Sequence, residues 1–353
     1  MEKQTNWVFK QKNKWGLTVL AAVLCLLLSP LMSMSLFMPQ WFALLPVLAL
    51  WLLGYVGSVS ASVCMGVFIG TIAIFYGAWG ALIGAVLMIP VVAVSAVSME
   101  RDQPFWQSVA AGGVTLFASM GAAVGMIAML TGSDVVTAIT GMVRQGMELS
   151  GAMGDSLLSM MVQMGVLGLP DGAAPGAVLD PAVRDELVST LLLMTDSVMR
   201  LEMPMQMATG AVTAGLLGQA ALRKGVNARG AKVEYPVLSS WRVPKGWGRI
   251  LGGTLVALYL LAQIIPQSMS TMFYVFSGVF DKIFALQGIA AVCYIIRDKG
   301  KPAFLQKAAF VLGYFVLGSF AMMLGIADQA MDFTRRRVYL DKLENPFDPR
   351  HGE

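Results

Sequence analysis

The chain has 353 residues, of which 57% are apolar and only 13% are charged, and its mean hydropathy is +0.69. Soluble domains carry about 25% charged residues, so this composition excludes an ordinary water-soluble enzyme. The net charge of +4 is small and is concentrated near the ends of apolar runs. This placement indicates membrane topology rather than nucleic-acid binding.

Long, unbroken apolar runs predict transmembrane helices, and roughly 20 residues per crossing leave room for about eight or nine spans. The candidate spans are 15–36, 41–57, 58–77, 79–98, 105–130, 187–222, 249–266, 270–296 and 303–327. The stretch from Trp41 to Ser98 contains no charge, and Gly54, Gly57, Gly77 and Gly80 mark the expected turns within it. Three short spans fit this stretch, and two long spans are the alternative. The expected fold class is an all-α, polytopic transmembrane helical bundle.

Basic residues in short loops mark the cytoplasmic side of a membrane protein. Basic residues precede the first span and occur throughout the 223–248 loop and the 297–307 loop. We expect the first span to be a transmembrane helix rather than a cleaved signal peptide. Nine crossings would leave the C-terminus outside, yet Arg335, Arg336 and Arg337 argue for the cytoplasm. We therefore expect eight full crossings in a bacterial inner membrane, with both ends cytoplasmic. The suspected re-entrant or split element is 270–296.

Acidic residues dominate 131–186, which we place outside the cytoplasm. An amphipathic helix is expected there, with its apolar residues at helical spacing: Met153, Leu157, Met160, Met161 and Met164. The chain then divides into a cytoplasmic basic N-terminus (1–14), an N-terminal membrane half (15–130), the extracytoplasmic segment (131–186), a C-terminal membrane half (187–330) and a polar tail (331–353).

Small residues recur every fourth position and so share helix faces. They are Gly54, Ser58, Ser62, Gly66, Gly70, Gly80, Gly84, Gly121 and Gly125. Small residues at this spacing let helix backbones approach closely within a membrane. The pattern predicts packing inside the chain or, as the alternative, a docking face for another membrane subunit.

Polar side chains inside a membrane are costly and often functional. The candidates to line a cavity for a small polar solute are Arg200, Glu202, Gln263, Asp281, Lys282 and Gln287. Glu202 is one possible partner of Lys282. Two alternatives stay open: Asp196, Arg200 and Glu202 could lie at the outer interface, and the polar groups could form a structural network across helices.

Other chemistry has little support in the sequence. The only histidine is His351, and Cys25, Cys64 and Cys293 are far apart within apolar runs, where we expect them to act as small hydrophobic residues. No metal site or cofactor is therefore expected. Motifs for a P-loop, a nucleophilic serine or a zinc hydrolase do not occur, so we expect no enzyme and no ATP-binding site in this chain.

Four local patterns carry a family resemblance: Arg200-Leu-Glu-Met-Pro204, Trp241-Arg-Val-Pro244, Leu286-Gln-Gly-Ile-Ala290 and Leu324-Gly-Ile-Ala-Asp328. In this order the chain resembles the YybS-like family of predicted bacterial membrane proteins. That family is similar in turn to the substrate-binding components of energy-coupling-factor transporters. The resemblance implies a non-enzymatic solute-capture subunit that works with coupling and ATPase subunits. The long 131–186 segment departs from those compact folds.

Three functional hypotheses follow from the sequence. The first is a solute-binding subunit of a transporter, whose cavity is lined by the candidate residues. The second is a membrane scaffold or assembly factor that acts through the glycine faces and the basic loops. The third is an intramembrane enzyme or ion-coupled carrier that would have to use Glu202 and Asp281.

Overall fold

The computed structural model describes residues 15–28, 44–169, 180–233, 235–243 and 245–332, and every regular element in these ranges is helical. The elements are α1 (Trp15–Leu28), α2 (Leu44–Tyr55), α3 (Ser58–Glu100), α4 (Phe105–Thr131), α5 (Val135–Leu149), α6 (Ala152–Gln163), α7 (Pro181–Ala228), η4 (Leu238–Ser240), α8 (Lys245–Ile264), α9 (Pro266–Asp298), α10 (Ala303–Val311), η5 (Leu312–Val316) and α11 (Gly318–Met331). This architecture confirms the all-α fold class. The basic N-terminus 1–14 and the tail from 333, with its three arginines, lie outside the described residues.

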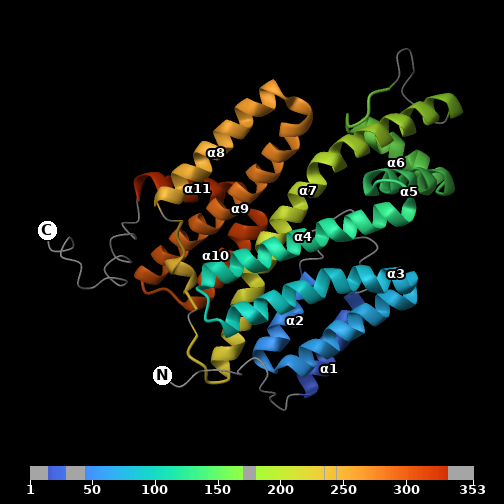
Figure 1. Ribbon diagram of the computed structural model, residues 1–353. Coiled ribbons are helices and arrows are strands. Elements are labelled where there is room, and N and C mark those ends of the chain that lie inside the picture. The colour runs from blue at the N-terminus through green and yellow to red at the C-terminus, as the bar shows by residue number, and fades with distance from the viewer. Residues whose placement is uncertain (1–14, 29–43, 170–179, 234, 244, 333–353) are drawn as a thin grey trace.

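Helix α3 is a hairpin with its tip at Gly77 (Figure 1). Gly77 has φ 70 and ψ −166, a conformation that favours glycine because it has no Cβ. A Cβ placed on Gly84 would lie 3.4 Å from the side chain of Phe68, whereas a straight helix would separate these two residues by about 24 Å. The two arms therefore pack against each other, with the break between the expected spans 58–77 and 79–98.

Helix α7 forms the axis of the molecule and packs against α2, α4, α5 and α9. It has 48 residues, so at 1.5 Å per residue it is about 72 Å long, more than twice the thickness of a bilayer core. The charged residues of its first half end at Glu202, and 203–222 is free of charge. Figure 1 shows α5 and α6 beside the first half. The charged residues of α7 are therefore confined to its first half and its last turns, on either side of the charge-free stretch 203–222.

The C-terminal part is built on the hairpin of α8 and α9, against which α11 packs. The expectation of a break within 270–296 is wrong, because α9 is one continuous helix of 33 residues. The bend lies further on, where Ala303–Tyr314 and Gly318–Met331 meet at 107°. A π-helical turn over 312–316, η5, precedes this bend.

Four described helices are long and apolar enough to cross a membrane, or five segments if the bent pair α10–α11 counts as one. These four are Ser58–Glu100, Phe105–Thr131, Gly246–Ile264 and Met269–Asp298. The count is below the expected eight for physical reasons. Helices α1 and α2 have only 14 and 12 residues in the described ranges, and α3 is counted once although it turns back. No part of α7, its charge-free stretch included, is apolar enough to be counted.

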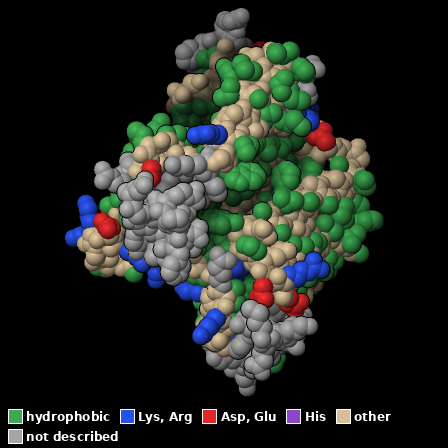
Figure 2. Space-filling view, turned by 60° about the vertical axis from the view of Figure 1, so that its left-hand side comes forward, with side chains coloured by type: hydrophobic (Ala, Val, Ile, Leu, Met, Phe, Trp, Pro, Cys, Tyr) green, Lys and Arg blue, Asp and Glu red, His purple; other side chains and the backbone are tan. Residues whose placement is uncertain are grey.

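The surface of the helical bundle is largely apolar, and Figure 2 shows hydrophobic side chains over much of one face. Ile74 on α3, Met129 on α4 and Ile264 on α8 are exposed by 84%, 86% and 74%. Water-soluble proteins rarely expose apolar surface on this scale. The exposed side chains are compatible with contact to lipid in a multi-pass membrane protein.

The glycines of the sequence pattern lie in two kinds of environment. Gly54 is buried against α7, Gly80 and Gly84 are buried against the first arm of α3, and Ser58 is half-buried. A Cβ on Gly54 would lie 2.5 Å from the carbonyl oxygen of Leu222, so α2 and α7 touch backbone to backbone. The remaining small residues, Ser62, Gly66, Gly70, Gly121 and Gly125, are exposed or half-buried. No other part of the described chain lies within 4 Å of a Cβ at these last four glycines.

The extracytoplasmic segment expected at 131–186 contains α5, α6 and the start of α7. Helix α6 buries Leu158 against α7, while the stripe of apolar residues predicted for it faces mainly outward. Met153, Met160 and Met164 are 75%, 49% and 61% exposed. The apolar stripe of α6 is therefore directed away from the protein, as in a helix that lies on a membrane surface.

Candidate functional site

The predicted polar residues separate into an outer cluster and an inner region. In the outer cluster, the Arg200 guanidinium donates to both carboxylate oxygens of Asp196, at 2.8 and 3.0 Å, and to Asp134 at 3.3 Å. These contacts join α7 to the start of α5, and the arginine side chain is 49% exposed. Their position agrees with the alternative of an ion-pair cluster at the outer interface.

Asp134 is also the N-cap of α5 and accepts hydrogen bonds from the backbone N–H and the hydroxyl of Thr137, at 3.0 and 2.8 Å. These bonds, and more weakly Arg200, lower the pKa of Asp134 from 3.8 to about 2. The pKa of Arg200 is raised by its hydrogen bonds to Asp196 and then to Asp134. The charged forms of both side chains are therefore favoured in the folded protein.

We expect Asp134→Asn to remove a small, pH-dependent contribution to stability. Because the folded pKa lies below the ordinary 3.8, the carboxylate stabilises the fold above about pH 4 and loses this effect as the pH falls towards 2. Asparagine still caps a helix, and the site is exposed, so the loss should not exceed about 1 kcal/mol. Thermal unfolding followed from pH 2 to 6 checks this, with Glu148→Gln on the exposed side of α5 as the control. Identical pH profiles for wild type and Asp134→Asn would contradict it.

Three predicted residues stand apart from any polar network. Glu202 is half-buried on α7, Gln263 is exposed on α8 and Asp281 is exposed on α9. Within the described ranges, none of them takes part in a hydrogen bond or an ion pair. The suggested pair of Glu202 with Lys282 is not formed.

Lys282 instead contacts an aromatic ring, with its ammonium nitrogen 4.8 Å from the centre of Tyr314. The ring of Tyr314 stacks on Phe310, and its hydroxyl is hydrogen-bonded to the hydroxyl of Thr213 on α7. A cation over an aromatic face is attracted by the quadrupole of the ring. These contacts connect α9, η5 and α7 in the interior of the C-terminal part.

The strongest polar network centres on Gln287, which is 1% exposed. Its side-chain oxygen accepts from the backbone N–H of Val243 at 3.0 Å, and its nitrogen donates to Asp328 at 3.2 Å and to Gln329 at 3.0 Å. Asp328 is fully buried. A buried amide and a buried carboxylate are tolerated because they are hydrogen-bonded. The network brings together three of the local patterns that carry the family resemblance.

A direct backbone contact between α9 and α11 holds this network in place. A Cβ on Gly288 would overlap the carbonyl oxygen of Ala321, and a Cβ on Gly325 would overlap that of Phe284. Only glycine at both positions allows the helices to approach so closely. Gln287 and Asp328, which neighbour these glycines, are thereby brought within hydrogen-bonding distance.

A cavity of about 380 Å³ lies beside the network, between α8, α9 and α11. Its lining residues are Gly248, Arg249, Gly252, Phe280, Phe284, Ile326, Gln329 and Ala330. Gln329 belongs to both the lining and the network, and its side chain lies against Gly248. The cavity lining thus provides one cation, one amide and an apolar wall with two phenyl rings. The volume of the cavity lies in the size range of small-molecule sites.

The candidate site overlaps only in part with the predicted one. Gln287 lies next to the cavity, whereas none of the other five predicted residues is in its lining. Arg249, Asp328 and Gln329 were not among the predicted solute ligands. Arg249 directly follows the basic 223–248 loop, and Asp328 ends one of the four local patterns, so neither position indicated a solute site. Small residues in a sequence suggest that helices approach closely, but they do not show which helices meet. The approach of α11 to α9 at Gly288 and Gly325 could therefore not be located from the sequence.

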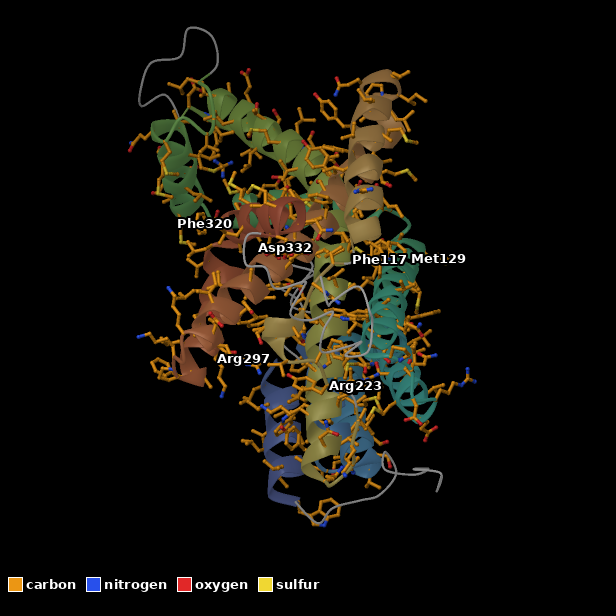
Figure 3. All side chains as sticks on the ribbon, turned by 90° about the vertical axis from the view of Figure 1, so that its left-hand side faces the viewer. Phe117, Met129, Arg223, Arg297, Phe320 and Asp332 are labelled. Carbon is orange, nitrogen blue, oxygen red and sulfur yellow. The ribbon has the colours of Figure 1, made fainter. Side chains whose placement is uncertain are left out.

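Sequence reasoning also missed the role of Arg223, which is 1% exposed near the end of α7 (Figure 3). Its guanidinium donates to the carbonyl of Gln103 at 2.5 Å and to the hydroxyl of Ser108 at 2.8 Å. The guanidinium carbon also lies 5.5 Å from the ring centre of Phe105. A basic residue beside a basic loop ordinarily marks topology, but here it connects α7 to the start of α4.

No family model, curated protein or solved structure matches this chain. Among the described residues, no three His, Cys, Asp or Glu side chains gather as a metal site would require. The cavity and its buried polar network therefore provide the structural basis on which a function can be argued.

Proposed function

We propose that this protein is a non-enzymatic membrane subunit that binds a small solute in the cavity between α8, α9 and α11. The observation that carries the proposal is the position of Gln329, which lines the cavity and is hydrogen-bonded to Gln287 inside the buried network. A polar side chain whose position is fixed by a hydrogen bond to a buried residue is preorganised to bind a ligand. The resemblance to substrate-binding components of energy-coupling-factor transporters supports the same role.

The cavity chemistry favours a solute with an acidic group and an apolar body. Arg249 is the charged residue of the lining, and a guanidinium binds carboxylates and phosphates through paired hydrogen bonds. Phe280 and Phe284 provide apolar surface for the rest of the molecule. Transport energy would have to come from ATPase and coupling subunits, because the chain has no nucleotide-binding motif.

The proposed topology has eight crossings and a cytoplasmic N-terminus. The crossings are α1, α2, the two arms of α3, α4, the charge-free half of α7, α8 and α9. The bent pair α10–α11 would enter and return on the cytoplasmic side, which leaves the C-terminus there. This arrangement is supported by the basic residues between α7 and α8 and between α9 and α10, which then share one side. The cavity would lie near the cytoplasmic end of α8, where an imported solute is released.

Native mass spectrometry of the full chain, purified in lipid nanodiscs, tests this proposal. We expect a small molecule bound in equimolar amount, and we expect an ATPase and a second membrane subunit to co-purify from native membranes. A stable protein that repeatedly purifies with neither ligand nor partner would contradict a solute-capture role.

A membrane scaffold is the second candidate, favoured by Gly66, Gly70, Gly121 and Gly125, where a Cβ would meet no other part of the described chain within 4 Å. If these faces bind another membrane protein, Gly66→Leu and Gly70→Leu should dissociate the complex, because a leucine side chain prevents close helix approach. Gly16→Leu on α1, where a Cβ also meets no neighbour, is the control. Quantitative co-purification measures the effect, and an unchanged complex would eliminate these faces as the interface.

A further inference from the structure

Two cysteines meet where α1 lies against the first arm of α3. The sulfur atoms of Cys25 and Cys64 are 2.8 Å apart, and both side chains are fully buried. They lie 39 positions apart in the sequence, which is why their spacing gave no sign of a pair. The third cysteine, Cys293, lies on α9, 3.5 Å from the carbonyl oxygen of Gln306.

Small side chains along this contact fix which residues meet. The hydroxyl of Thr18 donates to that of Ser60 at 2.8 Å. Ala21 on α1 and Ala61 on α3 are both buried between this hydrogen bond and the two cysteines. Small residues let the two helices approach closely. The contact therefore has a defined register, in which Cys25 faces Cys64 rather than another part of α3.

We propose that Cys25 and Cys64 are a redox-active pair that closes into a disulfide and reversibly clamps α1 to α3. The sulfurs stand 2.8 Å apart, and a disulfide bond measures about 2.05 Å, so a shift of less than about 1 Å joins them. All three cysteines are thiols in the structure. The clamp would matter most for α1, whose main contacts within the described chain are with α3 and α2 and which exposes several of its other apolar side chains.

The oxidant is a small, lipid-permeable disulfide, and the reaction is thiol–disulfide exchange. One cysteine thiolate attacks the reagent, forms a mixed disulfide and releases one reagent thiol. The second cysteine thiolate then attacks the protein sulfur of that mixed disulfide, which forms the Cys25–Cys64 bond and releases the second reagent thiol. Overall, the two cysteine thiols are oxidised to the disulfide and the reagent disulfide is reduced to two thiols, which carry the two protons that the cysteines lose.

The test treats the full chain in nanodiscs with an aromatic dipyridyl disulfide, then denatures it and labels the remaining thiols with a maleimide mass tag. We expect the oxidised wild type to accept one tag, on Cys293, and to regain all three after reduction. Its mass should fall by two hydrogen atoms, and a digest should contain the peptide that joins Cys25 to Cys64. Cys293→Ser should still form the cross-link, whereas Cys25→Ser and Cys64→Ser should not.

Two results would overturn the proposal. One is a wild type in which the cysteines remain unreacted and accept three tags after oxidation. The other is a protein in which Cys25 or Cys64 only gains the pyridyl group, without an intramolecular bond. Because the wild type itself gives the decisive readout, a folding defect in a serine variant does not affect the conclusion.

Discussion

Replacing Gly325 with alanine should destabilise the C-terminal part by about 3 kcal/mol, the upper end of the usual range for overpacking. The added Cβ would overlap the backbone carbonyl of Phe284, which cannot rotate away as a side chain could. Gly288→Ala should have a similar effect, because its Cβ would overlap the carbonyl of Ala321. Both changes push α11 away from α9 and should break the hydrogen bond between Gln287 and Asp328.

Gly318→Ala provides the matched control on α11, since nothing lies within 4 Å of a Cβ at this position. Its stability should equal or slightly exceed that of wild type, because alanine favours a helix by up to about 1 kcal/mol over glycine. Unfolding of each variant in the same detergent measures the differences. If Gly325→Ala unfolds at the same temperature as Gly318→Ala, the close contact between α9 and α11 is wrong.

Arg223→Ala should cost about 3–4 kcal/mol of unfolding free energy. The change removes the donor to the carbonyl of Gln103 and the hydroxyl of Ser108, and a buried polar group that loses its partner costs about 1–3 kcal/mol. It also leaves a cavity where the buried side chain packed on Phe105. The loss should be greatest where α7 meets the start of α4.

The neighbouring residue Lys224 is exposed, so Lys224→Ala is the matched control, with an expected change within about 0.5 kcal/mol. Arg223→Lys should fall between the two, because lysine keeps the charge but cannot donate in the planar fork of arginine. Equilibrium unfolding of the three variants measures these differences. Equal stability of Arg223→Ala and Lys224→Ala would show that the buried contacts of Arg223 contribute nothing.

Local features of this fold could be predicted because they depend on neighbouring residues. Helices α4 and α8 lie within a few residues of the expected ranges, since apolar runs of this length form helices. The turn between the arms of α3 falls at Gly77, where a positive φ requires glycine. The bend before α11 could not be predicted in the same way, because no proline occurs in 303–331.

Contacts between distant segments were harder to predict for a different reason. Gln287 meets Asp328 across 41 residues only because Gly288 and Gly325 allow α11 to touch α9. The sequence shows that Gln287 and Asp328 are polar, but it does not show that the two residues belong to one network. Arg200 illustrates the opposite case: it pairs with Asp196, its i, i+4 neighbour on the same helix, and the pair lies in the exposed outer cluster and not in the cavity.

The cavity is best tested with two adjacent glycines on α8. Gly252 lines the cavity and Gly253 does not, and a Cβ at either position meets no other atom within 4 Å. Leucine at either site should therefore leave the fold intact, but only Gly252→Leu extends into the cavity. The measurement is the fraction of purified protein that retains the bound small molecule by native mass spectrometry. We expect near-complete loss in Gly252→Leu and wild-type retention in Gly253→Leu. Equal retention by the two variants would place the solute elsewhere and contradict the proposed site.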